Sequence, residues 1–372
     1  MMAPDGRPER VLVVGGGVAG LATARALHRH GIECDVVERA RGWTHPGAGM
    51  YLPANTVRAL DRLGLKPPVV EHAHQILRQR FLDHRGRLLL DAELARVWGS
   101  TGPCLALGRR ELHEVMRDGI AVRLAMPVDT LREDGTRVHA HFADGSSAAY
   151  DVVVGADGVR SSIRTTACGG AHPNFLRQVS WRFLVDGFAE ISAWTAWLGP
   201  DRAFLAVPLG AGLLYCYADL DASAPIDPSR TDPAALAELY TRFAEPVPTI
   251  LAARQATGRA AYFSPIEEVA DEPWVRGRVA LVGDAAHAIS PNMAEGAGMA
   301  LEDALVLADT LASGEPLDAF EARRRPRVAF VRDQARRRDR MRGIPSGVRT
   351  AALRLAGQRI FRSNYSPLRA DP

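Results

Sequence analysis

Three glycines near the N-terminus have the spacing of a phosphate-binding turn. The pattern Gly-x-Gly-x-x-Gly, at residues 15–20, follows a short β-branched run and precedes a helical pattern. In such a turn Gly15 permits the tight bend, Gly17 lets a pyrophosphate approach the backbone, and Gly20 lets helix and strand pack closely. The helix start offers free N–H groups to the anion, and Glu38, after the next predicted strand, can bind ribose hydroxyls. The segment therefore predicts a dinucleotide site, without separating FAD from NAD.

Two later segments each join a predicted buried strand to a glycine turn. In the first, the apolar run after Asp151 leads into Gly155-Ala156-Asp157-Gly158. In the second, the strand Arg278–Val282 leads into Gly283-Asp284, followed by Pro291 and a glycine-rich helix start. Backbone N–H groups at such a helix start carry partial positive charge, which suits an anionic ring edge.

In this order, the three segments resemble the motifs of the single-component group A flavoprotein monooxygenases, which share the para-hydroxybenzoate hydroxylase fold. The resemblance runs from about Arg10 to Arg342 and is weakest between Gly170 and Asp271. It implies FAD as cofactor, NADPH or NADH as electron donor, and transfer of one oxygen atom from O₂ through a flavin C4a-hydroperoxide. It also implies a flat, electron-rich aromatic or polycyclic small molecule as substrate, which the protein positions while the cofactor carries the chemistry.

Matched to the family motifs, this chain has a candidate for each part of FAD. The glycine turn and Glu38 would hold the ADP half, and Arg109 would lie near the phosphates and ribityl chain. Asp157 would lie near the phosphate region, and Asp284 would hydrogen-bond the ribityl hydroxyls. Pro291 would sit beside the isoalloxazine, and the turn at residues 296–298 would face its N1–C2=O edge. The full set of cofactor-binding candidates is Gly15, Gly17, Val18, Ala19, Gly20, Glu38, Arg39, Gly49, Met50, Arg109, Asp157, Asp284, Pro291, Gly296, Ala297 and Gly298.

Some charged residues near these motifs have two interpretations. Arg39 and Arg41 follow Glu38 and could suggest a 2′-phosphate site, but a solvated surface pair is favoured because FAD should occupy this fold. His287 is expected to brace the Gly-Asp-Ala-Ala-His turn rather than to act in catalysis. The family usually has Gly-Gln-Gly where this chain has Ala-Glu-Gly, so Glu295 places an acid beside the expected flavin edge. No catalytic side chain and no metal ligand is assigned.

Aromatic residues gather in strand-length segments between residues 178 and 220. Period-two alternation puts Trp181 and Phe183 on one strand face, and Tyr215 and Tyr217 on another. Flat aromatic walls suit a flat substrate, and a few polar groups then orient it. The substrate-binding candidates are therefore these four residues, with Arg182 as a further polar one.

The predicted elements indicate an α/β fold, with a Rossmann-like FAD-binding domain and an inserted antiparallel-sheet substrate domain. The FAD-binding domain is predicted at residues 10–69, 99–170 and 272–342, and the substrate domain at residues 70–98 and 171–271. Residues 343–372 form a C-terminal segment of no assigned structure. At 372 residues the chain exceeds the ~250–300 at which a single core stops growing, which favours two domains.

The composition and charge of the chain indicate which kinds of partner it can bind. With 47% hydrophobic and 24% charged residues, the chain resembles an ordinary soluble globular protein. A net charge of +3, and acids interspersed among the arginines of residues 323–342, argue against a nucleic-acid partner. The four cysteines lie far apart, which favours free thiols in a reducing cytoplasm. No apolar stretch reaches the ~18 residues of a membrane span. We expect a cytoplasmic enzyme, monomeric or homodimeric, with O₂ and a small aromatic molecule as partners.

Other activities on the same fold remain as alternatives. A flavin-dependent halogenase needs an active-site lysine and a Trp-x-Trp motif; here Lys66 is the only lysine, and Trp194 and Trp197 have the wrong spacing. A non-oxygenating reductase or dehydrogenase, or a flavin-binding protein without turnover, stays open. The sequence also leaves open the substrate, NADH versus NADPH, the oligomeric state, and hydroxylation versus epoxidation or decarboxylative hydroxylation.

Overall fold

The strand that precedes the first glycine turn lies inside a parallel sheet. A computed structural model describes residues 7–43, 48–223, 233–258, 261–344 and 346–372. Its first sheet has six strands, in the order β18 (Val275–Arg276), β19 (Val279–Leu281), β12 (Val152–Gly155), β1 (Val11–Val14), β2 (Cys34–Val37) and β8 (Val122–Arg123). Every neighbouring pair is parallel except β18 with β19. The strands that lead into the three glycine turns, β1, β12 and β19, are buried throughout, as expected for strands of a covered parallel sheet.

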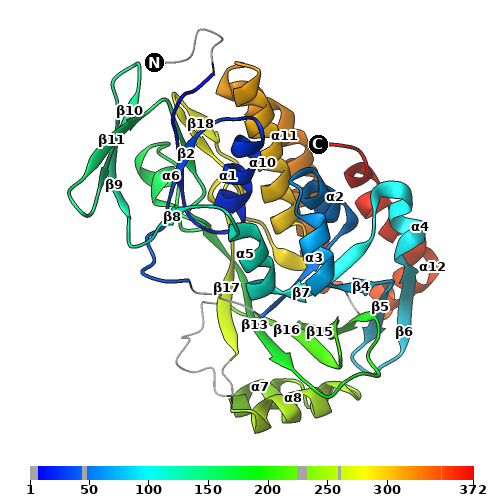
Figure 1. Cartoon of the computed structure of the whole chain (residues 1–372). Helices are drawn as coiled ribbons and strands as arrows, with labels where there is room; N and C mark the ends of the chain where they lie inside the picture. The colour runs from blue at the N-terminus through cyan, green and yellow to red at the C-terminus, as the bar shows by residue number, and fades with distance from the viewer. Residues whose placement is uncertain (1–6, 44–47, 224–232, 259–260, 345) are drawn as a thin grey trace.

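Helices pack around this sheet and against one another. The helix α1 (Val18–Arg29) lies against α10 (Gly296–Ala312), which also contacts α2 (Ala54–Arg62) and α11 (Leu317–Arg342), as Figure 1 shows. Nearly all of α10 is buried because neighbours surround it on several sides. Shorter helices complete this part: α3 (Lys66–His72), α4 (Leu94–Trp98), α5 (Arg109–Arg117), α6 (Ser162–Thr166) and α9 (Asp284–His287), with 3₁₀ turns at Gly99–Thr101, Pro291–Met293 and Ser366–Arg369.

The second large sheet has seven strands. Their order is β17 (Tyr262–Glu268), β13 (Asn174–Val185), β16 (Leu213–Asp221), β15 (Arg202–Gly210), β14 (Trp194–Leu198), β5 (Arg78–Asp83) and β6 (Leu88–Glu93). It is antiparallel except for the parallel pair β14 and β5, which joins the hairpin of residues 78–93 to the later strands. Two three-stranded sheets complete the chain: β3 (Gly49–Leu52), β7 (Cys104–Gly108) and β4 (His74–Ile76), and β11 (Ser147–Tyr150), β10 (Val138–Phe142) and β9 (Val128–Glu133).

The seven-stranded sheet is covered on both faces. One face packs against α7 (Pro233–Leu239) and α8 (Val247–Ala256), which lie along the bottom of Figure 1. On the other side, α12 (Ser346–Tyr365), drawn in red, lies against β6 at the edge of the sheet. The α/β fold with a second, mainly antiparallel sheet is the class that the sequence predicted. Within the described residues, no helix has both the length and the apolar character to cross a membrane.

Two helices of the structure have no counterpart in the sequence prediction. The helix α8 was not predicted, because its apolar residues lie under the sheet without clear polar alternation. The C-terminal segment, given no structure from the sequence, contains the 20-residue helix α12.

Candidate active site and cofactor-binding cleft

The first glycine turn contains two kinds of glycine. Gly15 and Gly20 lie in close backbone contact, whereas Gly17 faces open space. A Cβ at Gly15 would lie 2.3 Å from the carbonyl oxygen of Ala156, and one at Gly20 would lie 1.8 Å from the carbonyl oxygen of Gly15. These two glycines are therefore needed for close backbone contact. At Gly17, the N-cap of α1, a Cβ would have no atom within 4 Å, and no side chain caps this helix start. The turn thus leaves open space in front of free N–H groups, as a bound pyrophosphate requires.

Glu38, directly after β2, holds the turn from the side. The backbone N–H of Gly16 donates to its Oε2 at 2.8 Å, and that of Ala40 donates to its Oε1 at 2.9 Å. The imidazole of His113 lies 2.9 Å from the carbonyl oxygen of Gly16 and packs against the Trp43 ring. A charged acceptor that binds backbone N–H groups fixes the loop, and its remaining lone pairs stay available to a ribose.

Asp157, in the second glycine turn, caps a helix start. Its carboxylate accepts hydrogen bonds from the Ser161 hydroxyl at 2.5 Å, from the Ser162 backbone at 2.7 Å, and from the Ser162 hydroxyl and Ile163 backbone. Its backbone neighbours Ala156 and Gly158 line the cleft described below, but Asp157 does not. The structure therefore places this residue as a support for the turn.

The third turn presents one exposed acid in a buried run. Asp284 is exposed, while Gly283 before it and Ala285 after it are buried. Asp284 lines the cleft together with Pro291, Gly296 and Ala297. A carboxylate placed in this way can bind hydroxyl groups of a ligand.

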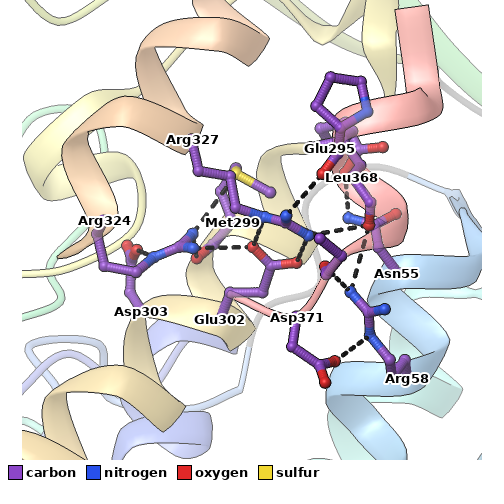
Figure 2. A network of polar contacts seen from close by, with 12 residues as sticks. Asn55, Arg58, Glu295, Met299, Glu302, Asp303, Arg324, Arg327, Leu368 and Asp371 are labelled. Atoms are coloured by element: carbon purple, nitrogen blue, oxygen red, sulfur yellow. Dashed lines mark hydrogen bonds and ion pairs between the residues drawn. The ribbon is translucent and has the colours of Figure 1, made fainter.

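A buried ionic network supports this third turn from behind. The carboxylate of Asp303 accepts from the Gly283 backbone at 2.9 Å and lies 2.6 Å from His287 Nε2. It also pairs with Arg324 Nε at 2.8 Å, as Figure 2 shows. Burial alone would raise the pKa of Asp303, but the charges of His287 and Arg324 lower it to about 2. His287 is 2% exposed and does not line the cleft, which agrees with a bracing role.

Glu295 lies beneath the loop that should face the flavin. It is 1% exposed, and the Asn55 side-chain amide donates to its Oε2 at 2.8 Å. Burial raises the pKa of Glu295 to about 8, so the acid is mostly neutral at pH 7. The acid found in place of the family glutamine thus behaves as a neutral hydrogen-bonding group and adds little charge to the loop.

One cleft joins these motifs to the face of the seven-stranded sheet. It has a volume of about 700 Å³ and includes thirteen predicted site residues. These are Gly17, Val18, Ala19, Gly49, Met50, Arg109, Asp284, Pro291, Gly296, Ala297, Arg182, Tyr215 and Tyr217. The remaining candidates do not line it: Gly15, Gly20, Glu38, Arg39, Asp157, Gly298, Trp181 and Phe183. Gly15, Gly20 and Gly298 allow close packing of the chain. A Cβ at Gly298 would lie 2.4 Å from Thr56 Oγ1.

The structure places Trp181 and Phe183, which were predicted to bind substrate, away from the cleft. Both are about 5% exposed and pack with Leu236, Tyr240 and Ile250 from the α7–α8 region. The strand register explains this result, because Trp181 and Phe183 pair with Ala218 and Cys216 and so face away from the cleft. Arg182, between them, pairs with Tyr217 and faces the cleft.

Arg182 forms the polar centre of the sheet face. Its guanidinium lies 3.0 Å from Ser264 Oγ, 5.5 Å from the centre of the Tyr217 ring and 5.8 Å from that of Tyr262. No carboxylate among the described residues lies within 4.0 Å of it. Burial raises the pKa of both Tyr215 and Tyr217, so the phenols remain hydrogen-bond donors.

Sequence reasoning missed the cleft residues contributed by α11, α12 and the hairpin of residues 78–93. They include Phe81, Leu90, Arg338, Arg342, Leu353, Ile360 and Phe361. Helical spacing of apolar residues after Ser346 was the signal that could have revealed the wall formed by α12.

The residues present fit FAD. The open space at Gly17 suits a pyrophosphate, and the exposed acid Asp284 suits a sugar-like chain. A Cβ at Gly296 would come no nearer than 4.0 Å to Asp284 Oδ1, which leaves the start of α10 accessible to a planar ring. The same cleft continues to a face with aromatic and apolar side chains, where a substrate can reach that ring.

Comparison with known proteins agrees with this geometry. Residues 9–335 match the protein family described as FAD binding domain. The chain is 34% identical over 365 residues to 3-amino-4-hydroxybenzoate 2-monooxygenase PtnB3 of Streptomyces platensis, covering 91% of this chain and 90% of that protein. It is 32% identical over 350 residues to the FAD-dependent urate hydroxylase of Klebsiella pneumoniae, covering 88% and 89% of the two chains.

A solved structure shows the same fold. The Klebsiella pneumoniae protein HpxO, crystallised with FAD and uric acid, superposes with a TM-score of 0.88 at 28% identity. The superposition covers 98% of this chain and 97% of that chain. The match therefore includes the glycine turns, the cleft and the seven-stranded sheet. The chain belongs to the family of single-component FAD-dependent aromatic monooxygenases with the para-hydroxybenzoate hydroxylase fold.

Proposed function

We propose that this enzyme oxygenates a flat, electron-rich aromatic substrate that carries an acidic group, and that Arg182 binds this group. The observation that carries the proposal is the Arg182 guanidinium, which faces the cleft with no ion-pair partner among the described residues. A partly buried guanidinium that has no ion-pair partner, and bonds only to hydroxyl groups, is suited to a carboxylate or phenolate. Tyr215 and Tyr217, whose phenols remain protonated, can donate to a second oxygen of the same substrate.

The relatives support this substrate class. Their names give 3-amino-4-hydroxybenzoate and urate as compounds that they oxidise, and both are flat, electron-rich and acidic. More than four fifths of this chain aligns with each of them. Its other cleft-lining arginines at the sheet end are bonded to protein: Arg160 to Glu267, Arg202 to Asp201, and Arg342 to Asp219.

The chain's own residues position the reaction. When bound, FAD would supply the redox chemistry, namely acceptance of a hydride from NAD(P)H and activation of O₂ for transfer of one oxygen atom. Gly17 and the start of α1 would hold the pyrophosphate, and Asp284 would hold the sugar-like chain. Gly296 and Ala297, at the start of α10, would offer backbone N–H groups that stabilise negative charge on the flavin ring. The aromatic and apolar walls of the sheet face keep water from the reacting centre.

This arrangement also supports a division of the chain into a cofactor-binding and a substrate-binding domain. We assign cofactor binding to residues 10–69, 99–170 and 272–342, and substrate binding to residues 70–98 and 171–271, with O₂ as a co-substrate. The four cysteines are free thiols, which supports a location in the reducing cytoplasm. A monomer or a homodimer is expected.

The test uses a panel of hydroxybenzoates together with their uncharged carboxamides. We expect the acids to stimulate NAD(P)H oxidation, and Arg182→Gln to raise the KM of a stimulating acid about ten- to a hundredfold, the loss of one charge-assisted hydrogen bond of roughly 1.5–3 kcal/mol. The KM of the matching carboxamide and the FAD content should change little. Equal effects on acid and carboxamide would contradict the proposal that Arg182 binds an acidic group.

A further inference from the structure

The cleft changes from polar to apolar across the seven-stranded sheet. Arg182 on β13 and Tyr217 on β16 line one end, whereas Trp194 on β14, Phe81 on β5 and Leu90 on β6 line the other. Five strand spacings of ~4.8 Å separate β13 from β6, so the lined face extends about 24 Å. This length is several times that of one aromatic ring, and the apolar end contributes nothing to binding an acidic group.

The helix α12 covers the apolar end. Leu353, Gly357, Ile360 and Phe361 line the cleft and recur at helical spacing, so they share one face of the helix. The ring centres of Phe81 and Phe361 lie 5.9 Å apart. A Cβ at Gly357 would lie 3.3 Å from Leu90 Cδ1, which shows how closely the helix approaches β6.

Hydrogen bonds hold this wall in place. After α12 the chain passes between Arg58 and Arg327, and both guanidinium groups donate to the Leu368 carbonyl oxygen, at 3.2 and 3.0 Å (Figure 2). Arg58 also donates to the carbonyl oxygen of Arg369, at 2.6 Å. Near the start of the helix, Arg349 donates to the Gly199 carbonyl oxygen on the sheet side, at 2.7 Å. Bonds at both ends make α12 a built wall of the cleft.

We propose that this apolar compartment, lined by Phe81, Leu90, Trp194, Leu353, Ile360 and Phe361, binds an apolar substituent several carbon atoms long on the aromatic substrate. The substituent extends from the ring on the side away from the acidic group. The proposal rests on the proposed function, because it takes the acid to be at Arg182. Apolar surface removed from water in such a compartment strengthens binding in proportion to its area.

A homologous series of probes tests the proposal on the FAD-loaded enzyme. Salicylate and its 4-methyl, 4-pentyl and 4-heptyl derivatives carry the chain para to the carboxylate, so an acid at Arg182 directs the chain toward β6. Dissociation constants are measured by quenching of protein and flavin fluorescence. We expect the affinity to rise about fourfold for each buried methylene up to the pentyl or heptyl compound.

Two leucines of α12 provide a matched pair of variants. Leu353 lines the compartment, whereas Leu355 is 89% exposed on the same helix. Leu353→Trp should fill the compartment and weaken binding of the heptyl compound by at least tenfold, with salicylate binding unchanged. Leu355→Trp should leave both unchanged. Leu353→Ser, which cannot fail by crowding, should flatten the dependence on chain length in the same direction.

The outcomes separate this inference from the proposed function. If salicylate binds and stimulates NAD(P)H oxidation but affinity does not depend on chain length, the compartment does not bind a substituent and the inference is wrong, while the proposed function stands. Equal losses in Leu353→Trp and Leu355→Trp would also overturn the inference. If no member of the series binds, both the inference and acid recognition at Arg182 are contradicted.

Discussion

Replacing Gly17 with valine is expected to give a folded protein that has lost its FAD. At this position φ is −81° and ψ is −172°, which any residue adopts, and a Cβ would meet no protein atom within 4 Å. The new side chain would instead occupy the space in front of the α1 N-terminus, where we propose that the pyrophosphate binds. Losing two charge-assisted hydrogen bonds of about 1.5 kcal/mol each weakens FAD binding roughly a hundredfold. Flavin absorbance of the purified protein and its thermal unfolding measure the two effects.

Gly20 supplies the control for this experiment. A Cβ there would lie 1.8 Å from the Gly15 carbonyl oxygen, so Gly20→Val should fail to fold rather than lose only the cofactor. Substitutions at two glycines of one motif are thus expected to have different effects, loss of FAD at Gly17 and loss of folding at Gly20. A Gly17→Val protein that retains a full complement of FAD would remove this turn from the cofactor site.

The second large effect is expected at Arg324, which is fully buried and pairs with Asp303 and Glu302. Arg324→Met leaves Asp303 as a buried charge with less compensation, and such a loss costs about 3–5 kcal/mol of unfolding free energy. Because the folded-state pKa of Asp303 is lowered to about 2, its stabilising contribution is present above pH 3.8 and is lost as the pH falls toward 2. Chemical denaturation at pH 7 measures the change.

Arg323 is the matched control, since it is exposed on the same helix. Arg323→Met should change the unfolding free energy by no more than about 0.5 kcal/mol. If the two variants unfolded at the same denaturant concentration, the network in Figure 2 would contribute little to stability. A large loss only at Arg324 would show that the turn carrying Asp284 depends on buried charges behind it.

The sequence predicted the cofactor half better than the substrate half, and the reason is physical. The three glycine turns are local motifs, because the strand, the turn and the helix that position Gly17 or Asp284 are contiguous in the chain. Alternation in β13 correctly separated Trp181 and Phe183 from their neighbours, but it could not say which face meets helices. The face that carries Trp181 packs against α7 and α8, which lie more than 50 residues later in the chain. The opposite face, with Arg182, therefore faces the cleft.

Other parts of the site depended on contacts that no local pattern encodes. The wall formed by α12 places residues near position 360 beside Phe81 and Leu90, which lie about 270–280 residues earlier in the chain. The neutral state of Glu295 arises from its burial, and the hydrogen bond from Asn55, a residue 240 positions earlier, partly opposes that rise in pKa. Asp157 was predicted to lie near the cofactor's phosphate region, and its carboxylate binds the start of α6.

The central claim, that this chain is a monooxygenase, is tested most directly by following the oxygen atoms. The FAD-loaded enzyme is supplied with NADPH or NADH, isotopically labelled O₂, and an acidic aromatic compound that stimulates NAD(P)H oxidation. We expect one labelled oxygen atom in each product molecule, with product formed in proportion to the NAD(P)H consumed. NAD(P)H oxidation that yields only hydrogen peroxide and unchanged compound, or a product that carries no label, would contradict it and favour a non-oxygenating flavoprotein.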